Sequence, residues 1–188
     1  MVDRSDTNPL SRYPRTLHLG DLAVVLRLAS PDDAALVLEL AVRQPADDLL
    51  YLRRDLTRPE EVEAWLDRAD RGQMAILVAQ SGDGLAGYAS LDRGDASWTS
   101  HVREIRVLVD AAHRGCGLGR ALVREALSLA YALGAHKILA QMPLEQESAQ
   151  RLFEDFGFSR EAVLKRHVRD RHGAKHDLVL MTLEPRDE

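Results

Sequence analysis

The stretch "HRGCGLGRAL", residues 113–122, is the most informative part of this sequence. Three of its glycines alternate with single residues, and an arginine stands on either side. A strand-like segment ends before it at Asp110, and an apolar helical pattern begins inside it at about Gly117. The N–H groups at the start of a helix have no intrahelical partner, and the helix dipole makes that end positive. The stretch therefore predicts a loop that binds an anion such as a phosphate group.

An alternative interpretation is a tight strand-to-helix turn that needs glycine for its geometry alone. Three alternating glycines with flanking arginines favour anion binding, because arginine suits phosphate oxygens. Two familiar phosphate loops do not fit. A Walker A loop needs lysine and a hydroxyl residue after its last glycine, whereas Arg120 and Ala121 follow Gly119. The dinucleotide pattern G-x-G-x-x-G fails from Gly115 and from Gly117.

Length and composition limit the class of protein. The 188 residues suit one domain, so we expect a tail or edge segment over 1–15 and a single domain over 16–188. The formal net charge of −5 gives no general attraction to nucleic acid, and no apolar run approaches the length of about 20 residues that crosses a bilayer. The single cysteine cannot form a disulfide within the chain, and no histidine spacing suggests a metal. We expect a cytoplasmic protein with no nucleic-acid or membrane partner.

Hydrophobic patterns predict strands and helices in a mixed order. Strands are expected over 21–29, 74–80, 85–91, 102–110 and 135–143, and in a final hairpin over 159–168 and 175–183. Helices are expected after Ser30, over 59–69, from about 117 to 133, and over 145–156. This order predicts an α/β sandwich of mixed strand direction.

Three segments together resemble one family. Residues 114–119, "RGCGLG", match the Q/R-x-x-G-x-G/A loop of the GNAT superfamily of N-acetyltransferases. "EIRVLVDAAH" before it resembles that family's central strand, and "ESAQRLFEDFGF" (147–158) resembles its A-x-x-L-Y-x-x-x-G-F helix. The resemblance is clearest from about Val102 to Phe158. It implies an α/β (α+β) fold, GNAT-like, with a mixed, mostly antiparallel central sheet flanked by helices.

The resemblance also implies that the cofactor is acetyl-CoA. Its pyrophosphate is expected on the loop, and its pantetheine arm along the end of the preceding strand. Gln146 stands where the family has asparagine, and Phe153 stands where it has tyrosine. The residues expected to bind the cofactor are Val107, Leu108, Val109, Arg114, Gly115, Cys116, Gly117, Leu118, Gly119, Arg120, Gln146 and Phe153.

Glu104 is the expected catalytic residue. It matches the glutamate that serves as general base in many bacterial members, and an amine acceptor must lose a proton before it attacks. The alternative role for Glu104 is an ion pair with Arg103, Arg106 or a neighbouring strand. Phe153 has no proton to give to the leaving thiolate, but a thiol with a pKa near about 8.5 leaves without much help. Cys116 is expected at the phosphate end of the cofactor, which excludes it as a nucleophile.

These observations predict an N-acyltransferase that moves an acetyl or short acyl group to a primary amine by direct attack in a ternary complex. The expected acceptor is a protein lysine or a small amine such as an amino acid, a polyamine or a drug. The chain resembles the catalytic domain of bacterial protein-lysine acetyltransferases, and this resemblance implies the lysine. Acceptor recognition is expected in residues 43–61. The alternative is a non-catalytic module that binds or senses acyl-CoA, with Phe153 as the sign of lost chemistry. A homodimer is left open.

Overall fold

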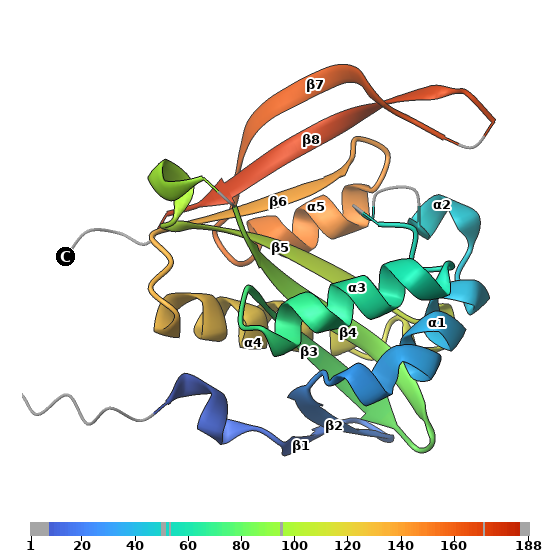
Figure 1. Ribbon diagram of the computed structural model, residues 1–188. Coiled ribbons are helices and arrows are strands. Elements are labelled where there is room, and N and C mark those ends of the chain that lie inside the picture. Colours follow the sequence, from blue (N-terminus) through green and yellow to red (C-terminus); the bar gives the residue numbers. More distant parts are fainter. Residues whose placement is uncertain (1–7, 50–51, 53, 95, 171, 185–188) are drawn as a thin grey trace, which may run out of the picture.

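The fold is built on one eight-stranded sheet, described here from a computed structural model covering residues 8–49, 52, 54–94, 96–170 and 172–184. Its strands lie in the order β1-β2-β3-β4-β5-β6-β8-β7 (Figure 1). Among the described strands, β5 and β6 pair in parallel and the other neighbours pair antiparallel. The strands are β1 (Arg15–Leu19), β2 (Leu22–Leu28), β3 (Met74–Ser81), β4 (Gly84–Arg93), β5 (Val102–Val109), β6 (Lys137–Pro143), β7 (Ser159–Arg169) and β8 (Lys175–Leu183).

Helices cover both faces of the sheet. Apolar residues at helical spacing bury α1 and α3 against β3 and β4, where Trp65 and Tyr88 meet edge to face. On the opposite face, α4 packs along β4 and β5, and Phe153 of α5 joins the same core (Figure 1). The helices are α1 (Ala34–Arg43), α2 (Ala46–Leu49), α3 (Pro59–Asp70), α4 (Leu118–Ala132) and α5 (Glu147–Glu154). The mixed, mostly antiparallel sheet between helices confirms the predicted fold.

The N-terminal part of the chain adds a strand that the sequence patterns did not indicate. Residues 8–15 carry a short 3-10 helix, Pro9–Arg12, and β1 begins at Arg15. Tyr13 and Arg15 both reach the buried Glu125 on α4, at 3.1 Å and 3.3 Å, which ties this segment to the domain. Residues 1–7 lie outside the described residues, and the boundaries of 1–15 and 16–188 stay predictions.

The parallel pair β5–β6 is short and then separates. Residues Val102–Ile105 pair with Lys137–Ala140, but β5 continues to Val109 and β6 to Pro143 without further pairing. Figure 1 shows the two strands diverging in this direction. Each strand therefore has one edge whose main-chain N–H and C=O groups lack a strand partner, and these two edges face each other.

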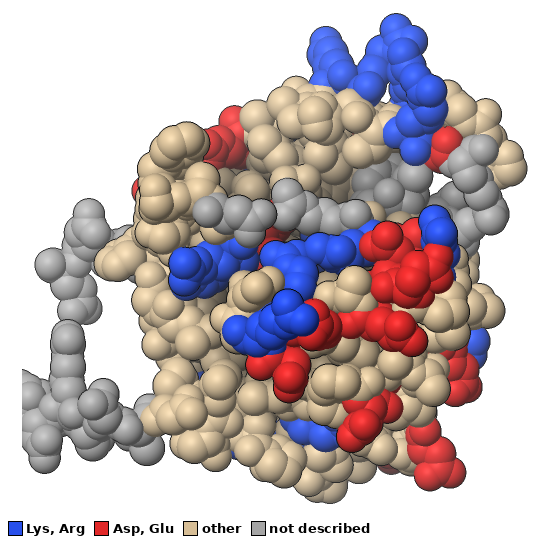
Figure 2. Space-filling model, viewed as in Figure 1, with Lys and Arg blue, Asp and Glu red and all other residues tan. Residues whose placement is uncertain are grey.

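The β7–β8 hairpin carries most of the exposed positive charge at the C-terminal end. Lys165, Arg166, Arg169 and Lys175 are all exposed there. Figure 2 shows basic side chains projecting from this hairpin into solvent. The alternating charges of this segment thus form a solvated surface, which is the usual role of such a pattern.

Close packing between β4 and β5 makes Gly87 essential for the shape of the sheet. A Cβ at Gly87 would lie 2.5 Å from the Leu108 carbonyl oxygen, which is backbone and cannot swing away. We expect Gly87→Ala to lower the free energy of unfolding by about 1–3 kcal/mol through overpacking, measured by urea denaturation. The matched control is Gly84→Ala on the same strand, where a Cβ meets nothing within 4 Å and the stability should hold. Equal stability of the two variants would contradict this account of the contact.

Candidate active site

A cleft of about 460 Å³ opens where β5 and β6 separate. Its walls are the ends of these two strands, the first turns of α5, and the loop that leads into α4. Eight of the residues expected from the sequence to bind a cofactor line it: Val107, Leu108, Val109, Arg114, Gly115, Gly119, Gln146 and Phe153. Four more of the expected residues do not line it but belong to the same loop and helix start: Cys116, Gly117, Leu118 and Arg120.

The strand edge along the cleft suits an extended ligand that carries amide groups. The other edge of β5 pairs with β4 up to Val109, so only the cleft edge offers main-chain donors and acceptors. An extended chain can pair with such an edge in the manner of an added strand. This interaction needs no polar side chains, and it agrees with the apolar character of Val107, Leu108 and Val109.

The glycines of the loop leave the main chain at the start of α4 without side chains beside it. Gly115 and Gly117 have φ values of 78° and 89°, in the left-handed region that glycine favours. Gly117 is the N-cap of α4, and the Ala121 N–H donates to its carbonyl at 3.0 Å. The N–H groups before Ala121 therefore precede the helical hydrogen bonds and are open to an anion. Nothing lies within 4 Å of a Cβ built at Gly117, so the space beside this glycine is open, as the predicted anion site requires.

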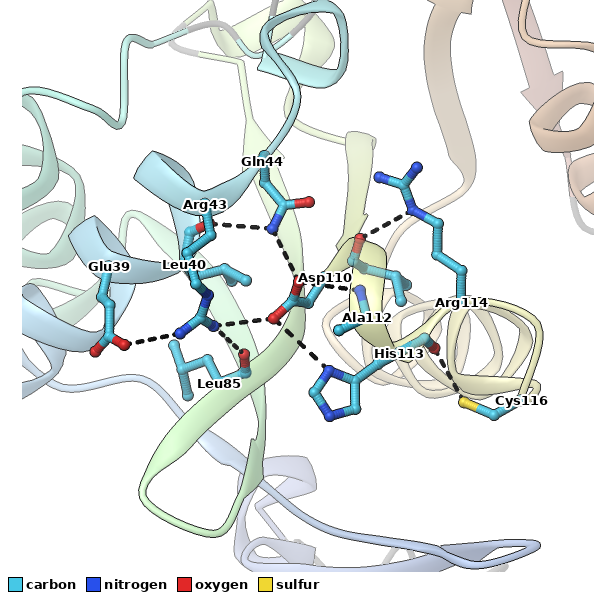
Figure 3. A network of polar contacts seen from close by, with 11 residues as sticks. Glu39, Leu40, Arg43, Gln44, Leu85, Asp110, Ala112, His113, Arg114 and Cys116 are labelled. Atoms are coloured by element: carbon cyan, nitrogen blue, oxygen red, sulfur yellow. Dashed lines mark hydrogen bonds and ion pairs between the residues drawn. The ribbon is translucent and has the colours of Figure 1, made fainter.

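Asp110 holds the entry to this loop in place (Figure 3). Its carboxylate is 6% exposed and accepts hydrogen bonds from Arg43 at 2.9 Å, the Ala112 N–H at 3.3 Å and the Gln44 amide at 3.4 Å. Burial raises the pKa of Asp110, but these three donors outweigh it and hold the pKa below its usual value. The charge of Asp110 thereby joins the end of β5 and the loop to the C-terminus of α1.

Both arginines that flank the glycines have carboxylate partners. Arg114 extends to Asp48 of α2, with Nη2 and Oδ2 2.6 Å apart, and both residues line the cleft. Arg120 pairs with Asp155, and its guanidinium lies 5.6 Å from the centre of the Phe156 ring. Arg120 therefore points along α5 rather than into the cleft, and its main-chain N–H is the group that remains at the helix start.

Glu104 lies one side chain away from the cleft. It is 7% exposed on β5 and accepts a hydrogen bond from Arg106, which does line the cleft. The ion pair that the sequence offered as the alternative is thus present. Register places Glu104 opposite Asp92 and Arg106 opposite Ser90, on the face of the sheet that α3 covers.

A small hollow of about 20 Å³ adjoins the cleft and shares Leu52 and Arg106 with it. Its other lining residues are Arg54, Leu56, Trp65, Tyr88, Ser90 and Asp92. Sequence reasoning missed the three from β4, although two polar residues at alternating positions in an apolar strand were a usable signal. Burial raises the pKa of Tyr88, so its phenol stays neutral.

Three further residues bear on the chemistry. Phe153 packs edge to face on Phe158, with ring centres 4.9 Å apart, and offers no proton. Ser148 brings a hydroxyl to the cleft. Cys116 donates its S–H to the His113 carbonyl at 3.0 Å, within the glycine loop.

Within the described part of the chain, no cluster of three histidine, cysteine or acidic residues could hold a metal, and no helix is long and apolar enough to span a membrane.

The cleft, the loop and the sheet are those of a known family. The model of the Acetyltransferase (GNAT) family matches residues 40–158, more than half of the sequence. This chain belongs to the GNAT family. Its membership confirms the prediction of an enzyme, an N-acetyltransferase that uses acetyl-CoA, and disfavours the non-catalytic module.

Individual proteins that are similar to this chain are also acyltransferases or acetyltransferases. The L-amino acid N-acyltransferase MnaT of Escherichia coli (strain K12) is 29% identical over 126 residues, which cover 64% of this chain and 70% of that protein. The L-methionine sulfoximine/L-methionine sulfone acetyltransferase of Salmonella typhimurium is 30% identical over 126 residues, covering 64% and 71%. The structure of YncA from Salmonella typhimurium with its cofactor acetyl-CoA superposes with a TM-score of 0.75 at 24% identity, covering 88% of this chain and 95% of that one. The names of the two enzymes concern amino acids and their analogues rather than a protein lysine.

The charge on Asp110 gives the loop a pH dependence. Because its pKa in the folded state is depressed, its contribution to stability is present above the unfolded value of about 3.9 and is lost as pH falls through the folded value. We expect Asp110→Asn to lower the free energy of unfolding by about 1–3 kcal/mol at pH 7, with the difference from the parent shrinking below about pH 4. Urea denaturation at several pH values measures it.

The control for that series is Asp83→Asn, which removes a carboxylate from the exposed turn between β3 and β4. Its stability should follow the parent at every pH. A difference between Asp110→Asn and the parent that does not change with pH would show that the charge of Asp110 is not what stabilises the loop.

Proposed function

We propose that this acetyltransferase acetylates the α-amino group of a small amino acid or a close analogue, by direct attack in a ternary complex. The observation that carries the proposal is the hollow beside the cleft. It combines the cations Arg54 and Arg106 with apolar walls from Leu56 and Trp65. A carboxylate suits these arginines, since arginine binds carboxylates through two parallel hydrogen bonds. At about 20 Å³ the hollow takes a group of that size, so the rest of the acceptor would lie in the adjoining cleft.

A protein lysine fits the same hollow poorly. Arg54 pairs with Glu61 and Arg106 with Glu104, and among the described residues Asp92 is the carboxylate that lines the hollow itself, so little there would hold a lysine ammonium. That carboxylate is already engaged, because Arg68 lies 3.6 Å from it. The substrates in the names of the two relatives also support a small amino acid. We therefore favour the small acceptor over the protein lysine that the sequence left open.

The cofactor residues keep the roles expected of them. Main-chain N–H groups from Gly117 to Arg120 would hold the pyrophosphate, and the free edge of β5 at Val107–Val109 would hold the pantetheine arm. Gln146, the N-cap of α5, would bind the arm from the opposite wall. When bound, acetyl-CoA supplies an activated thioester at the end of that arm. The chain's part is to aim this group toward Arg106 and the hollow.

Glu104 would take the proton of the acceptor. An α-amino group has a pKa near about 8, so a modest base is enough to free its lone pair at neutral pH. Because Glu104 does not line the cleft, the proton would pass through a water molecule, with Arg106 fixing the carboxylate. Phe153 cannot protonate the leaving thiolate. The thiolate would therefore depart without an acid, or with the help of the Ser148 hydroxyl. A homodimer and a cytoplasmic location stay predictions.

Glu104→Gln tests the proton transfer. We expect kcat to fall by about 10²–10⁴ at neutral pH, with the Kd for coenzyme A unchanged. The loss should shrink as pH rises, because the acceptor amine then loses its proton to solvent. Steady-state kinetics across pH, with coenzyme A binding by calorimetry, measures both. Glu63→Gln on the exposed side of α3 is the control. If the variant's turnover equalled that of the parent at every pH, Glu104 would have no part in proton transfer, and its role would be the ion pair with Arg106.

Arg54→Met tests the acceptor class. We expect KM for methionine to rise about tenfold or more, as befits a lost hydrogen bond to a charged group, while kcat changes little. Methionine amide should be a poor acceptor for the parent and insensitive to the change. Arg58→Met is the control, because Arg58 is an exposed arginine nearby that pairs with Glu60 outside the hollow. A lysine peptide acetylated faster than methionine would overturn the small-acceptor proposal.

A further inference from the structure

A second cavity, of about 440 Å³, lies at the other end of β5 from the acetyl-CoA cleft. Arg103 near the start of β5 lines this cavity, whereas Val109 at the end of β5 lines the cleft. The cleft lining extends back along β5 as far as Ile105, two residues from Arg103, so the two spaces lie near each other on this strand. The cavity is closed by the turn from α3 to β3, the ends of β2 and β4, and the C-terminus of α4. It shares no lining residue with the cleft among the residues described.

Two arginines face this cavity from neighbouring strands. Arg93 of β4 and Arg103 of β5 are directly opposite in the antiparallel register, so their side chains are on the same face. Like charges placed opposite each other destabilise a strand pair. Arg103 is also 9% exposed, which adds the cost of taking a guanidinium out of water.

Among the described residues, Arg103 has main-chain carbonyls as its hydrogen-bond partners. Arg103 donates to the carbonyls of Ser100 at 2.6 Å, Val102 at 3.0 Å and Leu133 at 3.3 Å. Burial first, and then the charge of Arg93, lower the pKa of Arg103. No carboxylate in the described part of the chain forms an ion pair with either arginine. That holds for Asp70 too, although it lines the same cavity.

Aliphatic side chains also line the cavity, beside its polar groups. Leu28 of β2, Leu91 of β4 and Leu133 after α4 face the same space as the two guanidinium groups. Charged groups beside aliphatic side chains suit a small molecule that has both an opposite charge and an apolar body. The two arginines outnumber the single carboxylate of Asp70, so the lining has a net positive charge that selects an anion, and the planar guanidinium suits a carboxylate in particular.

We propose that this cavity binds a small carboxylate with an aliphatic body, its carboxylate between Arg93 and Arg103 and its body against Leu28, Leu91 and Leu133. This site is separate from the catalytic cleft and does not rest on the identity of the acetyl acceptor. A neutral ligand of the same shape would gain only the apolar contact and would leave the two charges facing each other.

The test is a nuclear magnetic resonance titration of the full chain saturated with coenzyme A, which keeps the cleft occupied. The probe is 4-methylpentanoate, and 4-methylpentanamide is its uncharged counterpart. We expect saturable shifts of main-chain N–H signals around Arg93, Arg103 and Leu133 with the acid, and much weaker shifts with the amide.

Arg93→Gln is the informative variant, because Arg93 is exposed and holds no other group in the described structure, whereas Arg103 also supports three carbonyls. We expect the Kd for the acid to rise about fivefold, the upper range for an exposed charge pair. Arg169→Gln on the exposed β7–β8 hairpin makes the same charge change elsewhere and should leave the Kd as in the parent. Equal affinity for acid and amide, or an unchanged Kd in Arg93→Gln, would overturn the proposal.

Discussion

The pairing of β5 with β6 lasts for four residues on each strand, and the two strands then part. A sheet normally satisfies its main-chain groups by continuing to pair, so strands that separate while both remain extended leave donors and acceptors exposed to each other. Here the gap stays open because β4 pairs with the outer edge of β5, and β8 pairs with the outer edge of β6. The cleft is the direct result of this geometry.

Electrostatic contacts then position the loop at the end of the gap. The dipole of α4 and the bare N–H groups after Gly117 make that end positive without a fixed charge. Asp110 ties the loop to α1, and Arg114 ties it to α2. On the face of the sheet that α3 covers, Glu104, Arg106 and Asp92 lie on two adjacent strands. In the proposed mechanism this face receives the acceptor, so that one end of β5 would serve both the cofactor and the acceptor.

Sequence reasoning identified the fold and the family because their signals are local. Glycines at fixed spacing, a strand before them and a helix after them lie within about fifty residues, and periodicity gave most other elements. It missed β1, whose five residues follow a proline and include none that is fully buried. It also missed Tyr88, Ser90 and Asp92, because their proximity to Arg106 and Glu104 follows from the register of β4 on β5. The bridge from Arg114 to Asp48 joins residues 66 apart in the sequence, and no local pattern encodes such a contact. The roles of Glu104 and of the cofactor-binding residues stay predictions.

The outer strand β7 is an open edge of the sheet, and its features limit pairing with another strand. Its pairing with β8 is interrupted by two register shifts, and Arg166 between β-paired stretches has a φ of 54°. Lysine and arginine side chains stand along the same strand. Bulges and repeated positive charges both prevent a second strand from docking in register, which is how natural sheets avoid growing into fibrils. The hairpin can therefore project far from the domain without becoming a seed for aggregation.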